Sequence, residues 1–383
     1  MKGKITLILI VTGVIAACAF LGLSKDYRSI WTIWRIPLME LNFADLRNLT
    51  GGAESLAADY DPLYRNPGDP WGRRMNQPRL VQYIISGLKL DQSHTDFIGI
   101  LFISLFLLGV FISFKAINIM TALLLAVVIF SPAVMLGVER GNHDLFIFFL
   151  VSLALSTSNF AIISMSILLF ASFIKFYPVF ALPYFLKYDR RRFWLMFLSF
   201  VGAFVLYLDI NWPDLAQIFR TTQKGSGVLA YGSRSYFSIG LLPSFIPLAT
   251  IMAGCLMLHV YKINSKGVSQ DDVNYIDAFR VGAGIYVGTF FLGNNWAYRL
   301  MFLIFTIPQL VSWKDDPERR FISVLTLTGI IVSCWTIWFR GLIPRPVLSG
   351  IDEVFNWLIF STLFYFLIST MPSWLRNYMV NSR

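Results

Sequence analysis

Side chains capable of catalysis gather in five short polar segments of this sequence. The segments are 43–50 (FADLRNLT), 138–144 (VERGNHD), 173–178 (FIKFYP), 224–238 (KGSGVLAYGSRSYFS) and 293–299 (GNNWAYR). The carboxylates available as general bases are Asp45, Asp59, Asp61, Glu139 and Asp144. The cations suited to phosphate binding are Arg140, Lys175, Arg234 and Arg299. A base that takes a proton from a hydroxyl, beside cations that stabilise a phosphate leaving group, indicates group transfer.

The composition places these segments in a membrane protein. Of the 383 residues, 56% are hydrophobic and 14% are charged, whereas a soluble domain carries about 25% charged residues. Apolar stretches of roughly 18 or more residues recur along the chain and are typical of transmembrane helices. The net charge of +10 comes from cations clustered in short loops. That pattern sets membrane orientation and does not indicate a nucleic-acid partner.

The apolar stretches predict an all-α polytopic bundle with about 11–12 transmembrane helices in a single domain, 1–383. The expected spans are 5–23, 96–114, 116–138, 145–158, 160–174, 176–187, 193–210, 236–261, 279–293, 300–312, 321–339 and 353–371. The first is interpreted as a retained helix rather than a cleaved signal peptide. The three cysteines lie in apolar runs and are interpreted as packing residues.

The loop charges predict which side each loop occupies. Placing cation-rich loops inside puts both termini in the cytoplasm and the aromatic segment 24–95 outside, as a cap of short helices. The chain must then cross an odd number of times between Asp144 and Lys187, as three short pieces or as one span plus a broken segment. Pro178 is the predicted break. Lys175 either faces a cavity or extends to the membrane surface, and both interpretations remain open.

With this topology, the five polar segments meet at the outer face and predict a pocket there. Each has a simpler structural interpretation. Glu139 and Arg140 fit an ion pair at a helix end, and Asn142 with Asp144 fits a helix cap. Asn294 and Asn295 fit an interfacial turn. The spaced glycines Gly282, Gly284 and Gly288 favour helix packing over nucleotide binding. The sequence shows neither a metal-ligand cluster nor a cofactor motif, and divalent-metal dependence remains open.

Four of these stretches, in order, resemble the GT-C class of membrane glycosyltransferases, most of all glycosyltransferase family 87. They are FADLR with YDPLYRNPGDPWGRRMNQPRL, then ERGNHDLFIFFLVSLAL, then FIKFYPVFALPYFLKYDRRRF, and last NNWAYRLMFLIFTIPQL. The third is similar to the family's Lys-x-Tyr-Pro segment and the basic inner loop that follows it. The resemblance covers roughly residues 40–315.

The resemblance implies an inverting enzyme that uses a polyprenyl-phosphate sugar, a hexose such as mannose, as donor and a lipid or glycan hydroxyl as acceptor. It implies that Asp45 is the general base and that Arg140, Lys175 and Arg299 contact the donor phosphate. The other predicted substrate-binding residues are Glu139, Asn142, Asp144, Tyr177, Arg234, Asn294 and Asn295. A bacterial inner-membrane location is also implied.

Two other functions fit parts of the same sequence. A transporter or flippase for lipid-linked or anionic solutes also uses broken helices and intramembrane charge. A polymerase or ligase of lipid-linked glycans shares many of the same features but predicts a larger outer groove. A non-catalytic membrane scaffold is the remaining alternative.

Overall fold

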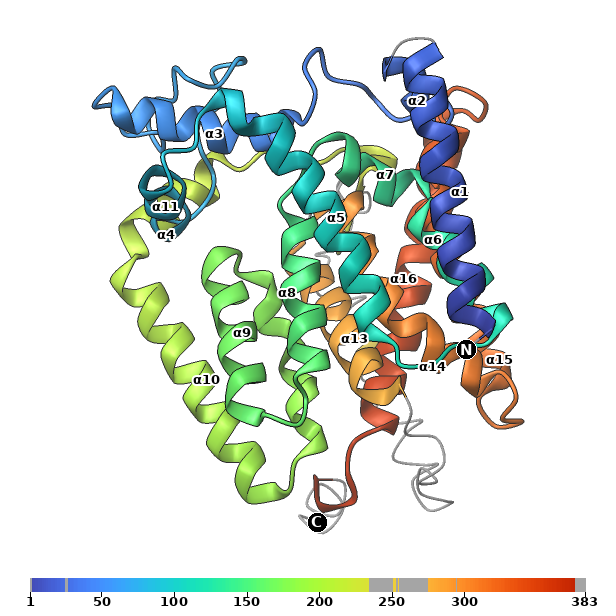
Figure 1. Cartoon of the computed structure of the whole chain (residues 1–383). Helices are drawn as coiled ribbons and strands as arrows, with labels where there is room; N and C mark the ends of the chain where they lie inside the picture. Colours follow the sequence, from blue (N-terminus) through green and yellow to red (C-terminus); the bar gives the residue numbers. More distant parts are fainter. Residues whose placement is uncertain are drawn as a thin grey trace.

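The protein is an all-α polytopic membrane protein, as predicted (Figure 1). The computed structural model describes residues 2–24, 27–233, 251–252, 254, 275–293 and 295–375. Within these ranges, five helices are long and apolar enough to cross a membrane. A sixth crossing results if α6 (Ile119–Ile129) and α7 (Pro132–Glu139), which are bent by 53° at their junction, count as one span.

The chain contains both long membrane-spanning helices and shorter helices. The long spans comprise α1 (Lys2–Ser24), η1 (Gln92–His94) with α5 (Thr95–Ser113), α10 (Arg190–Ile210), α15 (Arg320–Trp335) with η6 (Thr336–Phe339), and α16 (Arg345–Ser369). The shorter elements are α8 (Asp144–Ser156), α9 (Ala161–Ile174), η2 (Tyr177–Lys187), α13 (Ile276–Phe291), η5 (Ala297–Thr306) and α14 (Ile307–Trp313). The described residues therefore hold fewer full-length spans than the 11–12 expected, because several apolar segments form short or broken helices. The predicted span 236–261 lies almost entirely outside the described residues.

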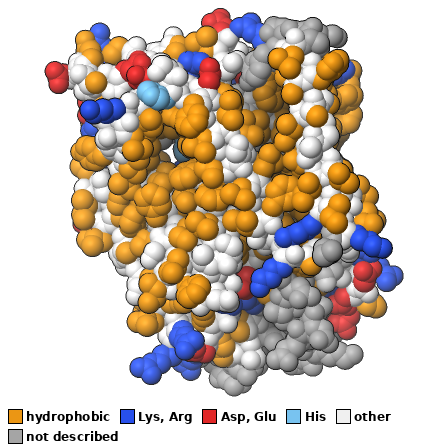
Figure 2. Space-filling model, in the orientation of Figure 1, with side chains coloured by type: hydrophobic (Ala, Val, Ile, Leu, Met, Phe, Trp, Pro, Cys, Tyr) orange, Lys and Arg blue, Asp and Glu red, His pale blue; other side chains and the backbone are white. Residues whose placement is uncertain are grey.

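A cap of short helices covers one end of the bundle, called here the cap face (Figure 1). Its elements are α2 (Tyr27–Thr32), α3 (Ala44–Ala57), α4 (Arg79–Gly87), α11 (Trp212–Thr221), η3 (Gly227–Leu229), and the antiparallel strands β1 (Ala230–Tyr231) and β2 (Asn295–Trp296). The start of α1 and the end of α16 lie away from this face. In Figure 2, hydrophobic side chains cover the middle of the molecule and charged side chains gather toward its two ends.

Between Asp144 and Lys187 the chain forms three short helical pieces, α8, α9 and η2, which agrees with one of the two predicted arrangements. Helix α9 ends at Ile174 because Lys175 is extended, with φ −149° and ψ 124°. The 3-10 helix η2 then begins at Tyr177, with Pro178 in its first turn. Lys175 contacts Asp144 at the start of α8, whereas Lys187 Nζ donates to the carbonyl oxygen of Ser158, just beyond the end of α8 (3.1 Å). The predicted break near Pro178 is confirmed.

The spaced glycines of α13 serve helix packing, as the sequence indicated. A Cβ on Gly284 would lie 2.3 Å from the carbonyl oxygen of Phe180, and one on Gly288 would lie 2.0 Å from the Phe180 ring. A Cβ on Gly282 would lie 2.7 Å from the carbonyl oxygen of Phe302. Small residues let neighbouring membrane helices approach this closely. The contacts with Phe180 pack η2, and with it the Lys175 turn, against α13, and the contact with Phe302 packs η5 there.

The Gly284→Ala variant is expected to be less stable than the wild type, because its new methyl group meets backbone that cannot move aside. Overpacking of this kind costs roughly 1–3 kcal/mol. Gly202→Ala in α10 is the matched control, since its Cβ would find no atom within 4 Å. The measurement is the apparent Tm of each purified variant in detergent. Equal Tm values for the two variants would contradict this packing role.

Candidate functional site

Asp45 is positioned by the way α3 docks on the turn after α7. The turn is made possible by Gly141, whose φ is +58°. A Cβ there would lie 2.7 Å from Cβ of Phe43, the residue before α3. Two backbone hydrogen bonds fix the approach: Phe43 N–H donates to the Glu139 carbonyl (3.2 Å) and Asp45 N–H to the Arg140 carbonyl (3.0 Å). The cap thus brings Asp45 to the end of the bundle.

The Asp45 carboxylate is held but remains partly open. Asn142 Nδ2 donates to Asp45 Oδ2 at 2.6 Å, and Arg73 Nη1 lies 3.6 Å from Asp45 Oδ1. Arg73 is itself anchored by Asp69, with 2.8 Å between its Nε and Asp69 Oδ2. The Asp45 side chain is 28% exposed. A carboxylate held in place yet accessible is suited to receive a proton from a bound hydroxyl.

Asp144 is the centre of a buried ionic cluster at the start of α8. Its side chain is fully buried and forms ion pairs with Lys175 Nζ and, at 3.3 Å, with Arg299 Nε. Asp144 lies in the first turn of α8, where the helix dipole favours a negative charge. Two cations share this carboxylate, so Asp144, Lys175 and Arg299 together carry an excess of one positive charge. A buried positive excess favours an anionic ligand.

Asn142 connects the two carboxylates. Its Nδ2 donates to Asp45, while its Oδ1 accepts from Asp144 N–H (2.9 Å) and from Lys175 Nζ (3.5 Å). The predicted helix cap differs in detail, because His143 is the N-cap residue of α8 and makes no side-chain cap hydrogen bond, while the Asn142 side chain binds the backbone N–H of Asp144. The Asp144 carboxylate is left to the two cations. One amide thus joins a partly exposed acid to a buried cationic cluster.

Aromatic and polar groups line the Arg299 side of the cluster. The Arg299 guanidinium lies 4.8 Å from the centre of the Tyr177 ring, and its Nη1 donates to Asn295 Oδ1. Asn295 lies on β2, whose pairing with β1 places Tyr231 opposite it. The Tyr177 hydroxyl is buried without a hydrogen-bond partner among the described residues. It is available to a ligand that supplies an acceptor or donor.

Glu139 and Arg140 form the ion pair that the simpler interpretation predicted. Arg140 Nε lies 3.0 Å from Glu139 Oε2. Both side chains also hold the linker between α2 and α3, since Arg140 Nη2 donates to the Pro37 carbonyl (3.0 Å) and Met39 N–H donates to Glu139 Oε1 (3.2 Å). Their contacts therefore position the cap. A role for either residue in binding substrate stays a prediction.

The structure brings together seven predicted residues from four distant segments of the chain: Asp45, Asn142, Asp144, Lys175, Tyr177, Asn295 and Arg299. The predicted residues Arg234 and Asn294 lie outside the described residues. Sequence reasoning missed Arg73 and Tyr298, a buried residue that interacts electrostatically with both Asp45 and Asp144. Tyr298 stands in the quoted segment GNNWAYR, so its position next to Arg299 was the available signal. Arg73 carried no comparable signal, because its partners depend on the fold of the cap.

A second missed feature clamps the cap together. Arg79 at the start of α4 binds Asp61 (2.7 Å) and Asp214 of α11 (3.0 Å). The hydrogen bond to Asp214 is the largest of the interactions that raise the pKa of Arg79. Asp61, one of the candidate bases, is thereby committed to a structural ion pair, and Asp59 lies exposed elsewhere in the cap. Asp45 is therefore the carboxylate among the five candidates that is both partly open and next to the cationic cluster.

The arrangement can remove a proton and stabilise a new negative charge within one site. Asp45 supplies the acceptor for the proton, and Lys175 with Arg299 supplies the positive excess. Neither a comparison with protein-family models nor one with curated proteins gave a match for this chain.

Proposed function

We propose that this chain is a membrane glycosyltransferase of the GT-C class, similar to family 87. It would move a hexose such as mannose from a polyprenyl-phosphate donor to a hydroxyl of a lipid or glycan acceptor. The observation that carries the proposal is the side-chain bridge through Asn142, which joins the partly exposed Asp45 to the buried Asp144–Lys175–Arg299 cluster. This bridge lies at the capped end of a helical bundle, where a lipid-borne substrate and a polar acceptor can meet.

In the proposed reaction, Asp45 takes the proton of the acceptor hydroxyl as the hydroxyl oxygen attacks the anomeric carbon of the sugar. A new C–O bond forms while the bond between the anomeric carbon and the phosphate oxygen breaks, and the configuration at that carbon inverts. The leaving polyprenyl phosphate carries the electron pair and an additional negative charge. Lys175 and Arg299 stabilise that charge, because their single carboxylate partner leaves one positive charge uncompensated.

Asp144 acts in this proposal as a positioning residue. It is buried and fully occupied by two cations, so it has no free face for the acceptor. The Asp144 carboxylate holds Lys175 in the break between α9 and η2, just before Pro178. It also orients the guanidinium group of Arg299. The proton acceptor and the phosphate-binding group are thus separate residues on separate elements, α3 of the cap and the α8–α9–η5 region of the bundle.

The proposed location is a bacterial plasma membrane, with the cap face outside. The cations Lys2, Lys4 and Lys187, with Arg190 at the start of α10, belong to segments at the opposite end of the bundle. Cations flanking membrane helices are retained in the cytoplasm. This orientation would place Asp45 and the Asp144 cluster at the extracytoplasmic surface, where polyprenyl-phosphate sugars serve as donors in place of soluble nucleotide sugars.

A transporter or flippase is the second candidate, and the broken α9–η2 segment is the observation that favours it. A proteoliposome assay separates the two functions. The purified protein receives polyprenyl-phosphate hexoses labelled in the sugar, mannose first, with a membrane lipid extract as acceptor, with and without EDTA. Label in a new acceptor-linked product supports the transferase. Movement of intact donor between leaflets, without any new product, would show that the protein is a transporter and not a transferase.

A further inference from the structure

A second cationic pocket, which no sequence motif predicted, lies at the cap face. It is lined by residues 35–37 of the α2–α3 linker, 226–229 at η3, and 340–345 between η6 and α16, together with Leu348 and Ser349. Its volume is about 1110 Å³. Three separate regions of the chain therefore build one cavity, which is large enough for a ligand of considerable size.

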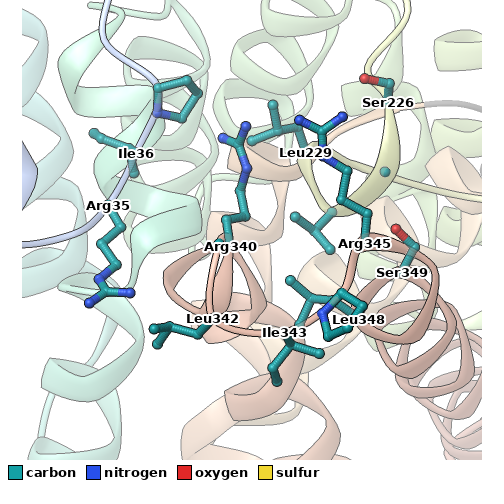
Figure 3. Close-up of a pocket in the computed structure, with 15 residues that line it drawn as sticks. Arg35, Ile36, Ser226, Leu229, Arg340, Leu342, Ile343, Arg345, Leu348 and Ser349 are labelled. Carbon is teal, nitrogen blue, oxygen red and sulfur yellow. The ribbon is translucent and has the colours of Figure 1, made fainter.

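The charge of this arginine pocket is one-sided. Arg35, Arg340 and Arg345 line it, and none of the described lining residues is acidic. Figure 3 shows the guanidinium groups of Arg340 and Arg345 extending in the same direction, toward the η3 segment. Neither arginine forms an ion pair with any residue that the structure describes. Burial, followed by repulsion from Arg345, lowers the pKa of Arg340, which agrees with two like charges facing one space.

Arg35 has a different role in the pocket wall. Its guanidinium turns away from the other two in Figure 3 and lies 4.6 Å from the centre of the Trp338 ring. The Trp338 indole N–H in turn donates to the carbonyl oxygen of Ile33 (3.1 Å). These contacts fix the α2–α3 linker against η6 and hold the wall opposite η3 in place. The pair Arg340 and Arg345 is left as the anion-binding group.

The apolar surroundings indicate that the anion belongs to a lipid. Ile36, Leu229 and Leu348 line the pocket beside the arginines. Leu342 also lines the pocket and is 56% exposed, so the pocket opens beside an apolar surface at the end of a membrane-spanning segment. Basic groups at the head of a lipid-facing surface recognise anionic lipid headgroups.

We propose that the arginine pocket binds the phosphate monoester headgroup of a membrane lipid, with Arg340 and Arg345 as the phosphate ligands. Paired guanidinium groups match the geometry of phosphate oxygens. The pocket is separate from the Asp144 cluster, but residues of the pocket wall are connected to residues that hold the cluster in place. Pro37 of the pocket wall accepts the Arg140 hydrogen bond, and Leu229 directly precedes β1. This inference concerns binding alone and stands independently of the proposed transferase activity.

Native mass spectrometry of the full-length protein in detergent tests the proposal. The probe is dioleoyl phosphatidic acid, and dioleoyl phosphatidylcholine is the comparator with the same chains but no net charge. The wild type is expected to bind the phosphatidic acid in preference. The Arg340→Gln/Arg345→Gln double variant is expected to bind it about tenfold or more weakly, because two charge-assisted contacts are lost. Arg191→Gln/Arg192→Gln, which removes two exposed cations at the other end of the bundle, is the matched control.

Two further measurements make the outcome decisive. The apparent Tm of the double variant is expected to equal that of the wild type, since neither arginine has an ion-pair partner among the described residues. If the double variant does not fold, Arg345→Gln alone takes its place in the binding measurement. Inorganic phosphate is added as a competitor. Displacement of the lipid by phosphate at equal concentration would assign the pocket to a soluble phosphate and overturn the lipid. Equal lipid binding by the double variant and the control would overturn the site itself.

Discussion

The Asp45→Asn variant is expected to lose sugar transfer by roughly 100-fold or more, because a general base contributes about 10²–10⁴ to a rate. Asparagine has nearly the same shape as aspartate but takes up no proton. The fold is expected to persist, since Arg73 keeps its contacts with Asp69 and with the carbonyl oxygen of Ala44 (2.5 Å). The measurement is the initial rate of transfer from labelled polyprenyl-phosphate hexose, at equal amounts of folded protein.

The matched control for this variant is Asp59→Asn. It makes the same chemical change on an exposed carboxylate of the same cap, at a residue whose backbone already has φ +61°. Asparagine tolerates this left-handed conformation, so the control is expected to transfer sugar at the wild-type rate. Full activity in Asp45→Asn would remove Asp45 from the role of base. Equal loss in both variants would show a general effect on the cap.

The Asp144→Asn variant is expected to be the most destabilising single change in the site. Removing this carboxylate leaves Lys175 and Arg299 as two largely buried cations without their shared anion. Breaking a buried ion pair in this way costs about 3–5 kcal/mol. The expected result is a large drop in apparent Tm and in the yield of monodisperse protein, with loss of transfer activity as a consequence.

Lys175→Met provides the comparison, because it removes one cation and leaves Asp144 paired one to one with Arg299. It is expected to be less destabilising than Asp144→Asn, although both changes act on the same ion pair. Thermal unfolding of the two variants in the same detergent measures the order. A larger Tm loss for Lys175→Met would contradict the charge balance derived for the cluster. Transfer by folded Lys175→Met protein is expected to fall, because the cluster no longer carries an excess positive charge to stabilise the donor phosphate.

Substituting the two aspartates is therefore expected to change different properties of the protein. Asp45 is partly exposed and held by an amide and an arginine at 3.6 Å, so its loss changes chemistry more than stability. Asp144 is buried between two cations, so its loss changes stability first. Burial, rather than residue type, separates a base from a positioning residue in this site.

The sequence alone determined the class of the fold and much of the site. Composition and long apolar runs require a helical membrane protein, because a bilayer leaves backbone hydrogen bonds to be satisfied within the helix. The position of Pro178 beside Lys175 was enough to predict a helix break, since proline removes a backbone donor. The cation-rich loops required an odd number of crossings up to Lys187, and three pieces are present.

Only the tertiary structure decided which charges pair and which remain free. Among the predicted phosphate ligands, Arg140 is taken up by Glu139 and the Pro37 carbonyl, and Lys175 shares Asp144 with Arg299. Arg340 and Arg345, which stand in an ordinary interhelical turn of the sequence, line a pocket without a described acidic neighbour. Pairing depends on distances of a few ångströms between segments that lie up to about 155 residues apart. Local sequence patterns specify helices and their ends, whereas the partner of a charge is fixed by how those helices pack.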